Sequence, residues 1–171
     1  MTEQEIHKIC KEFNIKKYHI NDDMSVDIDG NLNLSIMNIN QPIYELPLNF
    51  NRVKGKLDCS FNYLKSLKGA PKIVNDSVHL HYNRLESFKY MPSCSSIHLN
   101  DNNIKTFKYF NTDVKIIGVF DNPIYELWKL FEDVKHIEYF NELDIIQNNG
   151  KDVILDRLNY FLTDIGEKEV G

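Results

Sequence analysis

Three histidines are the residues whose type and spacing come closest to a metal site. His79 and His81 are separated by one residue, and His98 follows 19 positions after His79. A zinc site needs three or four such ligands that converge at bonding distance. His81 is displaced along the chain from the other two, and no cysteine lies beside them. The pattern favours a pH-sensitive contact surface, because imidazoles become charged slightly below neutrality. A His-site metal-binding protein is the alternative.

Motifs that carry catalysis are absent from the sequence. It contains no glycine-rich phosphate loop, no HExxH motif and no nucleophile elbow. Cys59 lies in an apolar run and is expected to be a small core residue, whereas Cys94, in a connector, is expected to be exposed. Three unclustered cysteines, Cys10 included, favour reduced thiols in the cytoplasm. We therefore expect a protein that is not an enzyme and needs no cofactor.

The charge of the chain is unevenly distributed over its 171 residues. The net charge is −5, made up of −3 in residues 1–40, +5 in residues 41–120 and −7 in residues 121–171. A basic middle flanked by acidic ends either steers a charged partner or is a solvated surface. Overall acidity argues against nucleic acid as the main target. The first residues do not form a signal peptide, and no apolar run reaches the ~20 residues of a membrane span.

A repeat with a period of about 20 residues organises the middle of the chain. Its windows are "LDCSFNYL" from Leu57, "VHLHYNRL" from Val78, "IHLNDNNI" from Ile97 and "IGVFDNPI" from Ile117. Apolar residues occupy the first, third and eighth places. The sixth place is always asparagine: Asn62, Asn83, Asn102 and Asn122. Alternating apolar residues predict a short strand, and a buried amide after it can satisfy backbone groups at a sharp turn.

This pattern resembles the leucine-rich repeat family in all four windows. The resemblance implies an α/β solenoid of about six short parallel strands, with a ladder of stacked asparagines inside the coil. Imperfect windows at Leu32, with Met37 at the asparagine place, and at Ile137, with Glu142 there, supply the outer two strands. Terminal repeats of a solenoid commonly depart from the consensus.

Caps are expected at both ends of a single domain. Residues 1–31 form the N-terminal cap, residues 32–145 the repeats and residues 146–171 the C-terminal helical cap. The first cap contains a helix over residues 2–13 with a capping box of Thr2 and Glu5, then a hairpin over residues 26–34 that turns at Asp29-Gly30. The last cap contains a helix over residues 152–165 with Asp152 as N-cap and Gly166 as the stop. The spacing of apolar residues over 123–134 predicts a short helix.

Residues between the inward apolar places are expected to project from the concave face of the sheet. Aromatic side chains exposed on a rigid surface are common binding anchors, although they can also fold over neighbouring side chains. The predicted protein-binding strip consists of Phe61, His79, His81, Tyr82, His98, Asp101, Phe120, Asp121 and Phe140.

The connectors and caps further resemble those of small leucine-rich-repeat proteins encoded by bacteriophages. The similar features are the "GAPK" connector, the hairpin cap and the closing "DVILDRLNYFLTDIG" helix. The resemblance implies a monomeric, non-enzymatic protein-binding module in the host cytoplasm that blocks a host defence or regulatory protein. The alternative from a different class is a structural or self-assembling component.

Overall fold

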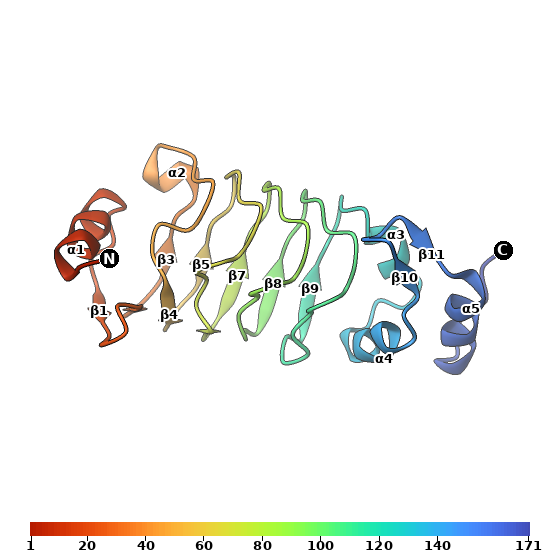
Figure 1. Cartoon of the computed structure of the whole chain (residues 1–171). Coiled ribbons are helices and arrows are strands. Elements are labelled where there is room, and N and C mark those ends of the chain that lie inside the picture. The colour runs from red at the N-terminus through yellow and green to blue at the C-terminus, as the bar shows by residue number, and fades with distance from the viewer.

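The chain winds into a solenoid whose successive turns stack side by side (Figure 1). The computed structural model describes residues 1–171. Five parallel strands form one sheet in the order β3-β5-β7-β8-β9. Their bounds are β3 Leu32–Asn33, β5 Leu57–Asp58, β7 Ser77–His79, β8 Ser96–His98 and β9 Ile116–Gly118. Equivalent places of neighbouring windows are paired, as Val78 is with Leu57 and Ile97. The predicted parallel-strand solenoid is confirmed.

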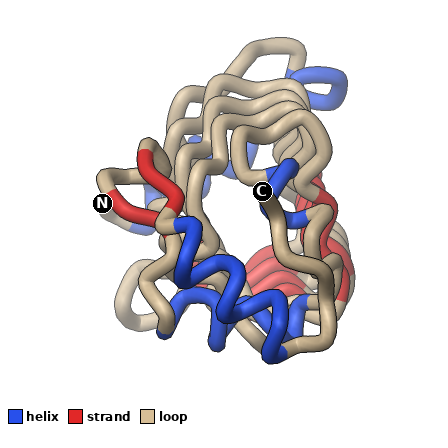
Figure 2. The backbone as a smooth tube through the Cα atoms, turned by 90° about the vertical axis from the view of Figure 1, so that its right-hand side faces the viewer, coloured by secondary structure: helices blue, strands red, loops and turns tan.

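A second sheet lies on another side of the coil and was not expected. Its order is β1-β2-β4-β6, and it is parallel except for β1. The bounds are β1 Tyr18–Ile20, β2 Val26–Ile28, β4 Phe50–Val53 and β6 Ile73–Val74. The first three turns of the coil each contribute a strand to this sheet and then one to the five-stranded sheet, as β2 and β3, β4 and β5, and β6 and β7 do. Figure 2 shows the turns superimposed around a common interior.

The expected hairpin over residues 26–34 is wrong. β2 and β3 belong to different sheets, and β2 instead pairs antiparallel with β1. Gly30 lies at a corner of the coil, and the equivalent corner of the next turn lies beside it. The two corners are joined by a hydrogen bond in which Gly55 N donates to Gly30 O at 2.9 Å. Asp29-Gly30 therefore carries the chain from one sheet to the other and does not reverse it. The actual hairpin closes between Asn21 and Ser25.

The N-terminal cap has the predicted helix. Helix α1 spans Glu3–Glu12, and both hydrogen bonds of the capping box between Thr2 and Glu5 are present. Its apolar stripe faces the solenoid, with Ile6 and Cys10 fully buried. A second short helix, α2 (Ile36–Ile39), follows β3.

The sixth predicted strand is wrong, because the window at Ile137 forms helix α4 (Ile137–Glu142). The short helix predicted over residues 123–134 is confirmed in its first part as α3 (Tyr125–Trp128), and a 3-10 helix η1 (Val134–His136) leads into α4. Ile137 and Phe140 are three residues apart, so one helical face buries both. A window without the turn asparagine fits a helix as well as a strand.

The C-terminal cap is a hairpin followed by a helix. Strands β10 (Ile146–Gln147) and β11 (Asp152–Val153) pair antiparallel, and helix α5 spans Leu155–Asp164. Asp152 is therefore not the predicted N-cap; Ile154 takes that place, because the hairpin holds Asp152 in extended backbone. Gly166, with a φ of 85°, follows the last helical turn as predicted.

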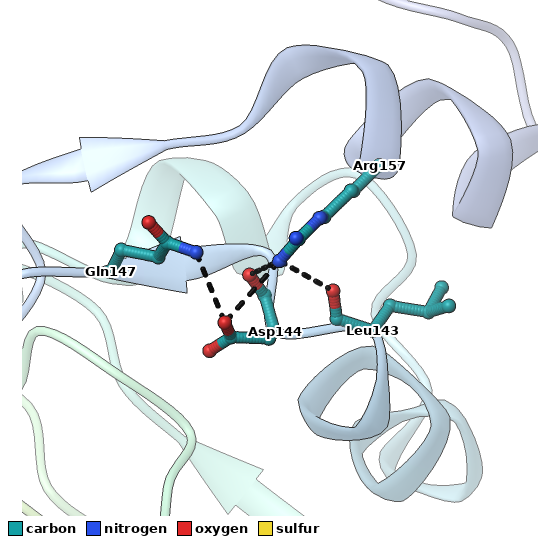
Figure 3. A network of polar contacts seen from close by, with 4 residues as sticks. All are labelled: Leu143, Asp144, Gln147 and Arg157. Atoms are coloured by element: carbon teal, nitrogen blue, oxygen red, sulfur yellow. Dashed lines mark hydrogen bonds and ion pairs between the residues drawn. The ribbon is translucent and has the colours of Figure 1, made fainter.

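An arginine joins α5 to the end of α4. Arg157 donates to the backbone oxygen of Asp144 at 2.9 Å and contacts the Asp144 carboxylate at 3.2 Å, as Figure 3 shows. None of the helices is long and apolar enough to cross a membrane.

Candidate protein-binding surface

The outward side of the five-stranded sheet carries most of the predicted binding residues. We call this surface the outer strip. It consists of the outward strand places Asn33, Asp58, His79, His98 and Gly118, the following places His81, Asn100 and Phe120, and the turn places Ile36, Phe61, Tyr82, Asp101 and Asp121. The strand pairing puts His79 beside Asp58 on one side and His98 on the other.

A buried asparagine sets the geometry of each turn after a strand. The Asn83 amide donates to Cys59 O at 2.9 Å and Leu80 O at 3.1 Å, and its oxygen accepts from Leu64 N at 3.0 Å. Each amide thus bonds within its own turn and to the preceding turn of the coil. Asn62, Asn102 and Asn122 make the equivalent bonds.

The residue before each of these asparagines has left-handed backbone. The φ angles are 60° at Phe61, 53° at Tyr82, 56° at Asp101 and 52° at Asp121. Because the asparagine side chain points into the coil, the preceding side chain is held outward on the strip. Left-handed backbone favours glycine, asparagine and aspartate, and is unfavourable for an aromatic residue.

Two exposed aromatic side chains form a stack on the outer strip. The rings of Phe61 and Tyr82 lie 4.6 Å apart at their centroids with an interplanar angle of 14°. They remain 48% and 51% exposed, so the stack hides one face of each ring and leaves the rest open to solvent. The stack therefore presents a rigid apolar surface on strained backbone.

Further aromatic residues are exposed at other places of these turns. Phe120 is 51% exposed and contacts Tyr125 edge to face at 5.2 Å. Tyr63 lies 5.3 Å from Tyr44, and the Arg84 guanidinium lies 4.4 Å over its ring. Tyr63 directly follows the turn asparagine Asn62, so its exposed position could have been predicted from the register of the repeat. Tyr44 precedes the first full repeat and has no such signal.

The three histidines gather in the middle of the strip. The rings of His79 and His98 stack at 5.0 Å, and His81 lies 5.8 Å from each. Burial, and secondly the neighbouring His79, lowers the pKa of His81 and of His98. No group of three or more His, Cys, Asp or Glu side chains has a geometry that could hold a metal ion. The arrangement is a half-buried imidazole cluster beside the aromatic stack.

Phe140 does not belong to the outer strip. It is 1% exposed in helix α4, and its ring lies 5.5 Å from Phe107 and Phe131 and 5.2 Å from Phe161. The prediction of Phe140 as a binding residue is wrong, because it depended on a sixth strand.

Burial makes the thiols of Cys59 and Cys94 poor nucleophiles. Cys59 is fully buried, as predicted, and burial raises the pKa of its thiol. Cys94 is only 8% exposed, contrary to expectation, and burial raises its pKa to about 11. Both thiols are protonated at neutral pH and unreactive as nucleophiles.

A groove lies beyond the outer strip. It measures about 1020 Å³ and runs between Thr106–Tyr109 and the turn that joins β10 to β11. Its lining is mainly polar, with Lys105, Lys108 and Lys151 at its margin. Nothing in its lining resembles a catalytic arrangement.

The geometry of the repeat defines the fold. Five turns each add one strand to a parallel sheet, and the four full repeats, with a period of about 20 residues, each carry a turn asparagine that bonds to the preceding turn. The chain is a solenoid of short parallel strands. No protein-family model matches its sequence, and no curated protein is significantly similar to it.

One solved structure with a similar arrangement is a chain of the crystal structure of the Drosophila melanogaster SNF/U2A′ complex. The match covers 83% of this solenoid and 94% of that chain, with 16% sequence identity and a TM-score of 0.40.

Proposed function

We propose that the solenoid is a non-enzymatic protein-binding module that uses the outer strip. The observation that carries the proposal is the exposed stack of Phe61 and Tyr82 on left-handed backbone. Aspartate occupies the same turn place in the next two repeats at lower conformational cost. Two such aromatic rings stacked on each other and still half exposed form an apolar surface that suits contact with a partner.

Rigidity is the basis of the proposed recognition. The turn asparagines fix the backbone that carries the stack, and the strands behind it are paired on both sides. A surface that is already ordered loses little conformational entropy on docking. A small number of aromatic anchors therefore gives useful affinity.

The finer proposal is that the solenoid is a bacteriophage protein that occludes a host defence or regulatory protein. It is supported by the similarity of the "GAPK" connector and the closing helix to those of small phage leucine-rich-repeat proteins. A single partner-binding surface suits inhibition by occlusion, which requires no catalytic group. The solenoid is proposed to act as a monomer.

The aromatic stack can be tested with a matched pair of double variants. The double variant Phe61→Asn/Tyr82→Asn removes both rings. It puts asparagine, which tolerates left-handed backbone, at both positions. Tyr90→Asn/Tyr109→Asn is the control, since these tyrosines also have positive φ, 67° at each, and are 51% and 56% exposed. Labelled protein is applied to an array of short random-sequence peptides. We expect the first variant to lose the peptides that wild type binds and the control to keep them.

Thermal melting decides whether a loss of binding is specific. Both double variants should melt within about 5 °C of wild type, because the replaced rings are exposed. Peptide binding that survives in Phe61→Asn/Tyr82→Asn, or an array on which wild type binds nothing, contradicts the proposed function.

A further inference from the structure

Three carboxylates on the outer strip have no cationic partner within the protein. They are Asp58, Asp101 and Asp121. The four ion pairs of the molecule lie elsewhere, between Lys54 and Asp29, Lys129 and Glu126, Lys135 and Asp133, and Arg157 and Asp144. Asp58 accepts one hydrogen bond, from Ser60 N at 2.9 Å, and no side-chain bond engages Asp101 or Asp121. Their negative charge faces outward and is uncompensated.

Lysine and arginine are absent from the outer strip and abundant on the connectors. The loops and corners after the turn asparagines carry Lys65, Lys68, Lys89, Lys105 and Lys108. The repeat register produces this separation, because each place of a repeat occupies the same side of the coil in every turn. The strip is therefore acidic although residues 41–120 are basic as a whole.

His81 and His98 do not cancel this negative charge at neutral pH. Burial and the neighbouring His79 keep the pKa of His81 and of His98 below its ordinary value, so these imidazoles are uncharged at pH 7. Asp58 and Asp101 both act on His81, which places the two carboxylates around the cluster.

The aromatic rings next to the carboxylates can also receive cations. Arg84 already places its guanidinium 4.4 Å over the ring of Tyr63. Asp101 occupies the turn place next to that of Tyr82, because β7 and β8 pair in register. A lysine or arginine docked there would contact an aromatic face and a carboxylate together, which is stronger than either contact alone.

We propose that the outer strip recognises a cationic segment of its partner, one that carries several lysines or arginines. This inference rests on the proposed function and adds the chemistry of the partner. The basic connectors strengthen the selection, because they repel the same segment and so confine it to the strip.

The experiment compares the charge of the peptides that wild-type protein binds with that of the whole random-sequence array. We expect bound peptides to be enriched in lysine and arginine. The isosteric double variant Asp58→Asn/Asp101→Asn should bind the most cationic of them about five- to tenfold more weakly in fluorescence anisotropy. Asp22→Asn/Glu167→Gln changes the net charge equally at exposed places away from the strip and should leave this affinity unchanged.

The outcomes separate this inference from the proposed function. Bound peptides that require Phe61 and Tyr82 but show no cationic enrichment, or whose affinity is unaffected by Asp58→Asn/Asp101→Asn, overturn the inference and leave the proposed function standing. Enrichment in acidic peptides, or equal weakening by the control variant, also overturns it. Failure of the proposed function would show instead as binding indifferent to the aromatic stack.

Discussion

At the scale of the residue, three side chains on or beside the outer strip are in states that lower the stability of the folded protein. Phe61 and Tyr82 occupy left-handed backbone that suits aspartate better. Ser60, beside Phe61, is 4% exposed, and its hydroxyl is the one buried side-chain polar atom without a hydrogen-bond partner. Such departures from the most stable choice cluster where a surface has a role beyond folding.

Ser60→Ala is expected to leave the free energy of unfolding unchanged or to raise it by up to about 1 kcal/mol, because it removes an unpaired buried hydroxyl. Ser35→Ala is the matched control one turn earlier. Ser35 is equally buried, but its hydroxyl donates to Asn33 Oδ1 at 2.7 Å. That control should lower the free energy of unfolding by about 1 kcal/mol. Urea titration measures both, and equal losses would contradict the role assigned to Ser60.

Acidification should destabilise the protein through His81 and His98. Burial and His79 lower the pKa of each, while Asp58 and Asp101 only partly oppose this at His81. Below the ordinary histidine pKa of about 6.5, the unfolded chain therefore binds more protons than the folded one. The contribution is fully present above that pH and is lost as the pH falls towards the folded pKa values.

The measurement is the urea midpoint at about pH 7.5 and pH 5. Wild type should lose more stability on acidification than His81→Gln/His98→Gln, and His19→Gln, on strand β1 outside the cluster, should behave as wild type. An equal pH dependence in all three proteins would show that the cluster does not govern it.

At the scale of the element, the unit is the strand with its turn asparagine. Neither half is stable alone, since a strand of two or three residues makes few hydrogen bonds of its own. The asparagine closes the turn and also bonds to the preceding coil, as Asn83 does to Cys59 O. Local conformation and stacking between turns therefore depend on the same side chain.

Asn83→Ala should lower the free energy of unfolding by roughly 2–4 kcal/mol. The change leaves Leu64 N and the carbonyl groups of Cys59 and Leu80 buried without this partner. Asn103→Ala is the control, because Asn103 is half-buried and its side chain makes no hydrogen bond. The control should stay within about 0.5 kcal/mol of wild type. Similar losses in both variants would contradict the ladder's part in stability.

At the scale of the whole molecule, the solenoid is closed by its caps. Beyond β9 no further strand continues the sheet, and a cluster of aromatic rings covers that end. Phe131 and Phe140 pack on the interior, and Phe161 of α5 contacts both, at 5.3 Å and 5.2 Å. Because this cluster covers the β9 end of the coil, we expect the protein to be a monomer.

Phe161→Ala should lower the free energy of unfolding by about 3–5 kcal/mol, because it leaves a cavity at the point where the cap meets the coil. Leu155→Ala on the same helix, where Leu155 is 45% exposed, should cost less than about 1 kcal/mol. Light scattering after size exclusion would find wild type at 20.1 kDa if it is monomeric. A dimer, or a negligible effect of Phe161→Ala, would contradict this account of the caps.

The sequence by itself determined the features that each repeat specifies locally. Apolar residues at Leu57 and Cys59 must face the interior, and Asn62 must follow at the turn. The outward places of Asp58, His79 and His98 follow from that register, and the pairing of the strands confirms it. The capping box of α1 could also be predicted from the sequence, because its two hydrogen bonds join residues that are three positions apart.

Only the tertiary structure decided the elements that depend on neighbouring turns. The alternation of Val26 and Ile28 indicated a strand, but not the sheet to which it belongs. Strands as short as β6 are defined by the hydrogen bonds of adjacent turns, so the sequence did not predict the second sheet. The spacing of Ile137 and Phe140 fits a strand or a helix. In the structure this window forms α4, in which Phe140 packs against Phe107, Phe131 and Phe161, and β9 is the last strand of the sheet. Burial of Phe140, and with it the true limit of the outer strip, follows from this packing.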